Sequence, residues 1–135
     1  MSRIKVLLRG EESGGAVSVV QAGAPPRFAG PYLHTHDFDE AFYVQEGELT
    51  FQLEDELFSA GPGELAFAPR GARHTYANRS DTPARFLIVC TPAGFERYFA
   101  RLAADQEGVD PPDWALGETP EVVRVGPRIG EEPSA

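Results

Sequence analysis

The sequence predicts an all-β domain in which short antiparallel strands form a sandwich or barrel, followed by a single C-terminal helix. Segments rich in β-branched and aromatic residues are short, and turns rich in the chain's 14 glycines and 12 prolines separate them. Residues 48–54 alternate polar and apolar side chains with a period of two, as a half-buried strand requires. A helical period of apolar residues occurs only after Thr91.

The first two strands are predicted at residues 4–9 and 16–21, with a charged turn between them. Residues 22–31 contain two glycines and three prolines, which predicts a loop. Two more strands, at residues 34–36 and 41–47, follow this loop.

In the middle of the chain, Leu49, Phe51 and Leu53 lie on one side of an alternating strand and should face the core. Further strands are predicted at residues 57–59, 65–68, 74–78 and 82–91. The barrel therefore spans about residues 3–91.

A helix is predicted at about residues 93–107, because apolar side chains recur there at i, i+3, i+4 and i+7. These side chains are Phe95, Tyr98, Phe99 and Leu102. We expect this face to pack against the outside of the barrel or a partner subunit. An aromatic stripe that binds a ligand is the alternative.

The barrel and helix together are predicted to form one domain over residues 1–109. Residues 110–135 are rich in proline, glycine and acidic residues and form a C-terminal extension. We expect contacts to order this extension up to about Val125 and its end to be mobile from Gly130 onward.

Charge and composition exclude several classes of function. The formal net charge of −9 argues against nucleic acid, whose phosphates require a basic face. The N-terminus lacks the apolar segment of a signal peptide, and no apolar run approaches the roughly 20 residues of a membrane span. The only cysteine, Cys90, lies in an apolar strand, which favours core packing and a reducing compartment. We therefore expect a cytoplasmic protein without membrane contact.

All three histidines of the chain fall into one pattern. Residues two apart in a strand project to the same side about 6.6 Å apart, so His34 and His36 can aim at one point. Glu40 follows after a short polar break, and His74 begins another alternating segment. The four side chains predict a site for one divalent transition metal, and the donor set suits Fe, Ni, Mn, Zn or Cu.

The same residues carry a family resemblance. The pattern Gly30-x3-His34-x-His36-x3-Glu40-x6-Gly47 closely resembles the first motif of the cupins, with a shorter gap before the first histidine.

The second cupin motif is matched at every fixed position by Gly63-x5-Pro69-x-Gly71-x2-His74-x3-Asn78. Fifteen residues separate the two motifs, which is similar to small single-domain cupins. The resemblance implies a double-stranded β-helix, or jelly roll, with a metal held inside by His34, His36, Glu40 and His74.

Residues of the same strand parity as the metal ligands should line a cavity beside the metal. These are Tyr32, Phe42, Val44 and Tyr76, which predict a mostly apolar and aromatic pocket for a flat or apolar small molecule. Inward aromatic residues also fill any small barrel, so core packing is the alternative for this set. Asn78 is expected to tie down a turn.

An open coordination position beside such a pocket predicts a metal-dependent enzyme acting on a small apolar or aromatic molecule. The resemblance to quercetin-dioxygenase-like cupins implies dioxygenase chemistry, with Glu40 as a catalytic residue that alternates between ligand and general base. The alternatives are a metal-dependent isomerase or lyase, a non-catalytic module that binds a metal or small ligand, and a structural metal barrel. Cupins often dimerise through exposed strand edges, so we expect a homodimer.

Overall fold

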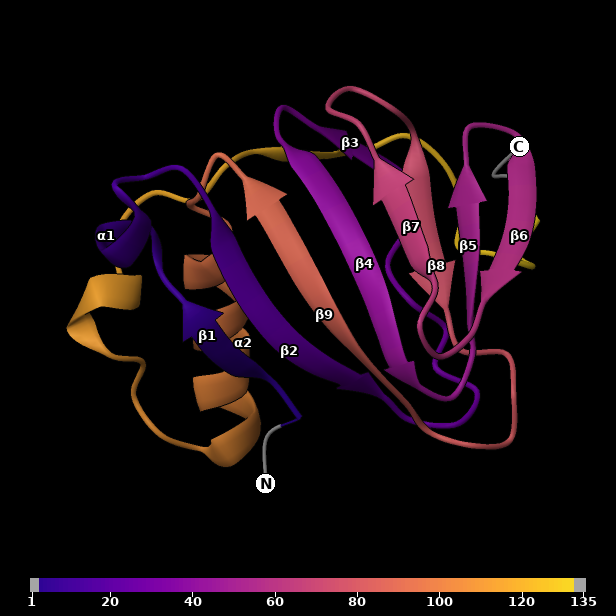
Figure 1. The fold of residues 1–135 in the computed structure, drawn as a ribbon, viewed down its shortest axis with the longest axis horizontal. Helices are drawn as coiled ribbons and strands as arrows, with labels where there is room; N and C mark the ends of the chain where they lie inside the picture. Colours follow the sequence, from indigo (N-terminus) through magenta and orange to yellow (C-terminus); the bar gives the residue numbers. More distant parts are fainter. Residues whose placement is uncertain (1–2, 133–135) are drawn as a thin grey trace.

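Two five-stranded antiparallel sheets face each other in the computed structural model, which describes residues 3–132 (Figure 1). The first sheet has the order β1-β2-β9-β4-β7, with β1 at Lys5–Leu8, β2 at Ser18–Ala24, β9 at Ala84–Thr91, β4 at Asp39–Glu46 and β7 at Leu65–Ala68. The second has the order β10-β3-β8-β5-β6, with β10 at Val122–Arg124, β3 at His34–His36, β8 at His74–Ala77, β5 at Leu49–Leu53 and β6 at Glu56–Ala60. This is the predicted jelly roll, a double-stranded β-helix.

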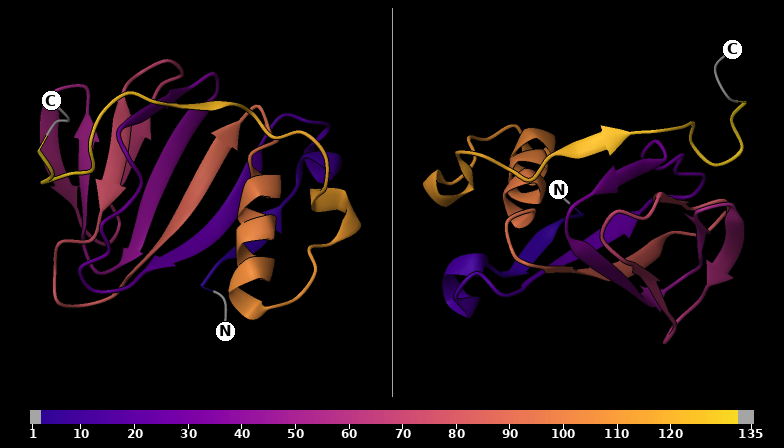
Figure 2. Two further views of the ribbon diagram at one scale, coloured as in Figure 1. Left: turned by 180° about the vertical axis from the view of Figure 1, so that it is seen from behind. Right: turned by 90° about the horizontal axis from the view of Figure 1, so that it is seen from above.

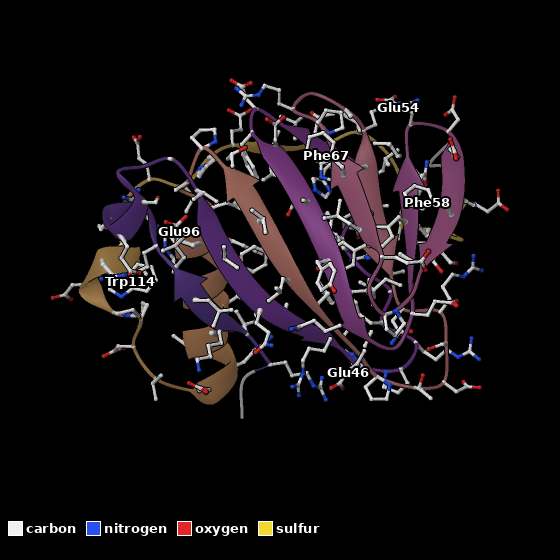
Figure 3. All side chains as sticks on the ribbon, in the orientation of Figure 1. Glu46, Glu54, Phe58, Phe67, Glu96 and Trp114 are labelled. Atoms are coloured by element: carbon white, nitrogen blue, oxygen red, sulfur yellow. The ribbon has the colours of Figure 1, made fainter. Side chains whose placement is uncertain are left out.

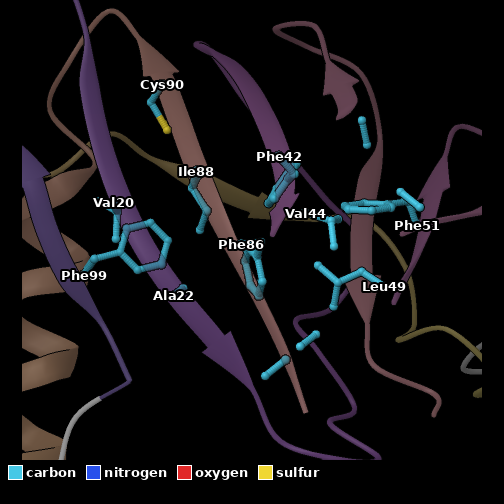
Figure 4. Packing of buried hydrophobic residues seen from close by; sticks show 14 of the residues in the cluster. Val20, Ala22, Phe42, Val44, Leu49, Phe51, Phe86, Ile88, Cys90 and Phe99 are labelled. Atoms are coloured by element: carbon cyan, nitrogen blue, oxygen red, sulfur yellow. The ribbon is translucent and has the colours of Figure 1, made fainter. Parts of the chain in front are cut away.

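The long strands of the first sheet bury alternate residues. In β2 every second side chain from Ser18 to Ala24 is buried, and β9 alternates in the same way. The buried side chains meet those of β4 and β5 in one hydrophobic core, where Phe42, Phe86 and Ile88 pack together (Figure 4). This alternation fixes which residues of β3, β4 and β8 can face the space between the sheets.

Two glycines of the first motif allow strand segments to approach closely. Gly30 has a φ of 77°, and a Cβ atom there would lie 1.8 Å from the carbonyl oxygen of Tyr76. Gly47 has a φ of 76°, and a Cβ atom there would lie 2.4 Å from the carbonyl oxygen of Pro83. Asn78 donates from Nδ2 to carbonyl oxygens of the neighbouring loops, including that of Thr82 at 2.8 Å, so it ties down the turn as expected.

The helices are α1 at Gly10–Ser13, α2 at Glu96–Glu107 and the 3₁₀ helix η1 at Asp113–Ala115. Helix α1 occupies the charged turn predicted between the first two strands. Helix α2 begins three residues later than expected, because Gly94 has a φ of 144°, outside the helical region. It ends where Gly108 takes the left-handed conformation.

The prediction that α2 packs on the outside of the barrel is wrong. The helix lies on the same side of the first sheet as the second sheet does, beside the open end of the barrel (Figure 2). Phe99 joins the hydrophobic core, and the ring of Phe95 lies 5.1 Å from that of Phe38. The aromatic stripe therefore faces inward, because burying it there covers the sheet face that the short second sheet leaves open.

The C-terminal extension crosses the open end of the barrel after η1. Its strand β10 pairs with β3, and the Val125 amide donates to the carbonyl oxygen of Leu33 at 2.8 Å. Residues 129 and 130 form a turn, across which the Glu131 amide donates to the carbonyl oxygen of Arg128. The predicted mobile end includes residues 133–135, which lie outside the described residues.

Candidate metal centre

The four predicted ligands come from three strands and meet between the two sheets. His34 and His36 lie on β3, Glu40 on β4 and His74 on β8. His34 is the direct partner of His74 in the β3–β8 pair, which brings their rings to 4.4 Å between centroids. One ligand atom from each of the four side chains lies within 4.8 Å of the other three.

Each imidazole is oriented by its own backbone neighbourhood. The Nδ1 atoms of His34, His36 and His74 lie 2.7, 3.0 and 3.0 Å from the carbonyl oxygens of Tyr32, Phe38 and Ala72. A carbonyl oxygen can only accept, so each Nδ1 carries the proton and donates. Nε2 is then the nitrogen of each ring that faces the cluster, and its lone pair can bind a metal whenever it carries no proton, in the arrangement that fixes histidine ligands in metalloproteins.

Glu40 lies between two of these imidazoles. Its Oε1 atom is 3.0 Å from Nε2 of His36 and 3.1 Å from Nε2 of His74. Burial alone would raise the pKa of this carboxyl, but its contacts with His36 and then His74 outweigh burial and hold the pKa below its usual value. The group is therefore a carboxylate at neutral pH.

Burial lowers the pKa of His34, so its imidazole stays neutral at physiological pH. His36 is also buried, and its ring stacks on that of Phe38 at 3.6 Å between centroids with an angle of 2°. A neutral His34 imidazole and an ionised Glu40 carboxylate suit the binding of a cation. The three nitrogens and one oxygen therefore fit a divalent transition metal, and the set suits each of the five predicted ions.

Two exposed ion pairs hold the turn that leads into His74. Asp39 accepts from the backbone amide of Arg70 at 2.9 Å and from its guanidinium at 3.2 Å. Glu54 accepts from the backbone amide of Arg73 at 3.0 Å and from its Nε at 2.9 Å. Both contacts lower the pKa of the carboxyl group. The turn that aims His74 is thus held on two sides.

A cavity of about 780 Å³ opens beside the cluster, and both His34 and Glu40 line it. The predicted pocket residues Tyr32, Phe42 and Tyr76 line it as well. Burial raises the pKa of Tyr76, so its phenol keeps its proton.

Val44 is the predicted pocket residue that does not belong to the cavity. It shares the parity of Phe42, but it lies farther along β4 and is completely buried in the hydrophobic core. Parity along a strand selects the inward face, whereas the depth of the cavity decides which inward residues a ligand can reach.

The predicted pocket residues make up only part of the cavity wall, although an aromatic stripe that binds a ligand is the alternative that the sequence offered for the helix. Helix α2 contributes Phe95, Tyr98, Phe99 and Leu102, the C-terminal extension contributes residues 119–122 and 124, and the loop before β3 contributes Phe28, Gly30 and Pro31. The i, i+3, i+4 and i+7 pattern indicated the helical stripe but not the side of the sheet that it covers. No sequence signal places the extension.

Cys90 does not belong to the cluster. It is buried on β9 opposite Glu40 of β4, and burial raises the pKa of its thiol, so it is not a nucleophile at neutral pH.

Fold and site together define a jelly-roll protein with a cluster of three histidines and one glutamate between its sheets that could hold a metal. Residues 20–90 match the family model described as "Cupin domain". The chain therefore belongs to the cupin family, as both motifs predicted. Among residues 3–132, no helix is long and apolar enough to cross a bilayer.

One curated protein is similar to part of the chain. The "Endoribonuclease YbeY" of Myxococcus xanthus is 35% identical over 81 residues, which cover 60% of this chain and 27% of that protein. This chain thus spans about a quarter of the curated relative that it matches.

Two solved structures are similar to the chain over about two thirds of its length. A sugar phosphate isomerase from Silicibacter pomeroyi has a TM-score of 0.55 and 30% identity, covering 66% of this chain and 59% of that one. The polyketide cyclase RemF from Streptomyces resistomycificus has a TM-score of 0.58 and 26% identity, covering 65% of this chain and 63% of that one.

Proposed function

We propose that this cupin is a metal-dependent enzyme, of dioxygenase type, that acts on a small apolar or aromatic organic molecule. One observation carries the proposal: His34 and Glu40 belong both to the metal cluster and to the wall of the cavity. A molecule in the cavity would therefore lie directly beside the metal. The rest of the wall is mostly aromatic and aliphatic, which favours a flat apolar substrate.

The three histidines and Glu40 would hold the metal, which when bound would supply an open coordination position and a Lewis acid. The rings of Tyr32, Phe42 and Tyr76 would hold the substrate and exclude water around it.

Glu40 is the proposed catalytic residue. Its Oε1 atom contacts two histidines, whereas Oε2 has no hydrogen-bond partner among residues 3–132. Because Glu40 lines the cavity and is ionised, Oε2 can accept a proton from a substrate carbon or hydroxyl. A Glu40→Gln variant should lose turnover by at least about 100-fold, the usual contribution of a general base.

A metal-dependent isomerase, lyase or cyclase is the second candidate, because it needs the same ionised base beside the same cavity. The similarity to the sugar phosphate isomerase and to the polyketide cyclase supports this candidate. Nucleic acid is not the proposed substrate, although the Myxococcus relative is named an endoribonuclease. The net charge of −9 disfavours binding to phosphates.

The test combines elemental analysis of untagged protein with dioxygen uptake on a panel of flavonols and diketones. Near-stoichiometric iron, nickel or manganese with substrate-dependent uptake is the result expected for a dioxygenase. Stoichiometric metal with no uptake would instead favour the isomerase, lyase or binding role. Protein that takes up no metal under any loading condition would overturn the proposal as a whole.

A further inference from the structure

Arg124 is a cation in the cavity wall that the metal site does not use. In the β10–β3 pair Arg124 lies directly opposite His34. Side chains of directly opposite residues in an antiparallel pair project to the same face, with Cβ atoms about 5 Å apart. His34 points toward the cluster, so the side chain of Arg124 projects from the same face of the strand pair. Both side chains line the cavity.

The guanidinium of Arg124 is positioned by an aromatic ring. Its Cζ atom lies 3.4 Å from the ring centroid of Tyr32, which also lines the cavity. Stacking on a ring face restricts a guanidinium while leaving its N–H groups free at the edge. Among residues 3–132, no carboxylate lies within 4.0 Å of the Arg124 guanidinium, and no other side chain or carbonyl group accepts a hydrogen bond from it. Its donors are therefore available to a ligand.

Arg128 stacks on the same ring as Arg124 but differs from it in its hydrogen bonds. Its Cζ atom lies 3.7 Å from the ring centroid of Tyr32. Its Nε atom, however, donates to the carbonyl oxygen of Gly30 at 3.0 Å, and its Nη1 atom lies 3.4 Å from Oε2 of Glu131. Arg128 fixes the C-terminal extension, whereas the guanidinium of Arg124 lines the cavity and donates to no hydrogen-bond acceptor among residues 3–132.

The charges of the wall point to one class of ligand. Apart from the ionised Glu40 of the cluster, the charged side chains that line the cavity are Arg124 and Glu121. Both side chains are exposed, so solvent screens both charges, but only Arg124 is held on an aromatic ring of the wall. A planar guanidinium matches the two oxygens of a carboxylate, and the aromatic wall matches an apolar body.

We propose that Arg124 binds a carboxylate of the substrate, so that the enzyme acts on an apolar, most suitably aromatic, carboxylic acid. This inference rests on the proposed function, since it assumes that the cavity is the substrate site. The carboxylate would lie on the Tyr32 side of the cavity, and the body of the molecule would extend toward the metal cluster.

The test is calorimetric titration of the full-length chain with 2-naphthoate and with its neutral counterpart, 2-naphthalenemethanol. Wild type, Arg124→Gln and Arg128→Gln are compared, each with metal removed by a chelator and each loaded with Zn²⁺. Wild type should bind naphthoate at least about tenfold more tightly than the alcohol, as a charge-assisted hydrogen bond predicts. Arg124→Gln should lose this preference and keep its affinity for the alcohol, and Arg128→Gln should keep the preference.

The assignment would be overturned if the wild type did not bind naphthoate or did not prefer it to the alcohol. A preference that survives Arg124→Gln would also overturn it, and would mean that the metal centre binds the carboxylate. An equal loss of the preference in Arg128→Gln would overturn it too, and would mean that both arginines act only by holding Tyr32. If Arg124→Gln does not fold, Arg124→Lys replaces it and should reduce the preference by losing the two-pronged contact. The metal-free titrations do not depend on metal content or turnover, so failure of the proposed enzyme activity can be recognised separately.

Discussion

At the scale of single residues, His74 is the candidate ligand that the second motif supplies to the site. Its substitution is the most direct test of the cluster. His74→Ala removes one of four donors, so we expect metal affinity to fall by at least about 100-fold. Its buried ring contributes little to the hydrophobic core, so the barrel should still fold. Metal content after dialysis and circular dichroism would measure the two effects.

Tyr76→Phe is the matched control for His74→Ala. Tyr76 lies two residues along the same strand and lines the cavity, but it is not part of the cluster. This variant should retain its metal. Full metal content in His74→Ala would remove His74 from the ligand set and leave His34, His36 and Glu40 as the candidate site.

At the scale of elements, the turn between β7 and β8 shows how surface charge supports a buried site. Asp39 and Glu54 hold this turn through Arg70 and Arg73, and those contacts lower both carboxyl pKa values in the folded chain. A lowered folded pKa contributes stability that is fully present above the ordinary carboxyl pKa. That stability is lost as the pH falls through the lowered values.

The double variant Asp39→Asn, Glu54→Gln should therefore melt at a lower temperature than wild type at neutral pH. The difference should shrink and then vanish on acidification, because the wild-type carboxylates become protonated as well. Thermal melts of chelator-treated protein at a series of pH values would measure it. Glu56→Gln, which alters an exposed residue of β6, is the control and should show no such trend. A difference in melting temperature that stays constant with pH would contradict a stabilising role for the ionised Asp39 and Glu54 carboxylates.

Gly30 allows the segment that precedes β3 to lie close to the backbone of β8. An alanine there would take a φ of 77° and place its Cβ atom 1.8 Å from the Tyr76 carbonyl oxygen. Gly30→Ala should thus lower the free energy of unfolding by at least about 3 kcal/mol. Gly71 has a φ of 82° with no atom within 4 Å of such a Cβ, so Gly71→Ala should cost only about 1 kcal/mol. Urea unfolding would compare them, and equal losses would show that backbone strain alone requires glycine at position 30.

The cluster could be predicted from the sequence because His34, His36 and Glu40 lie close together in the chain and the resemblance to the second cupin motif supplies His74. In a strand, residues spaced as His34 and His36 are project to the same face. The cupin motifs imply that Glu40 and His74 lie beside them. The cavity wall could not be predicted in the same way. Helix α2 and β10 reach it through contacts with residues far away in the chain, so an arginine at position 124 gives no sign that it will lie opposite His34.

At the scale of the whole molecule, the first sheet presents an apolar edge. Phe67, labelled in Figure 3, lies on its edge strand β7 together with Leu65. Leu65 and Phe67 have 59% and 50% of their surface exposed, and Tyr43, the direct partner of Leu65 on β4, is 40% exposed. An edge strand with unpaired backbone groups and exposed apolar side chains favours pairing with another chain. We propose that a second copy of this chain covers this edge.

Sedimentation at micromolar concentration should therefore give a dimer, and Phe67→Lys should shift it toward monomer, because a lysine on an edge strand opposes pairing. Leu57→Lys is the control, since Leu57 is 56% exposed but lies on β6, the edge of the other sheet. A wild type that sediments as a 14.7 kDa monomer would remove the homodimer. A dimer that dissociates with Leu57→Lys and not with Phe67→Lys would move the interface to the β6 edge of the second sheet.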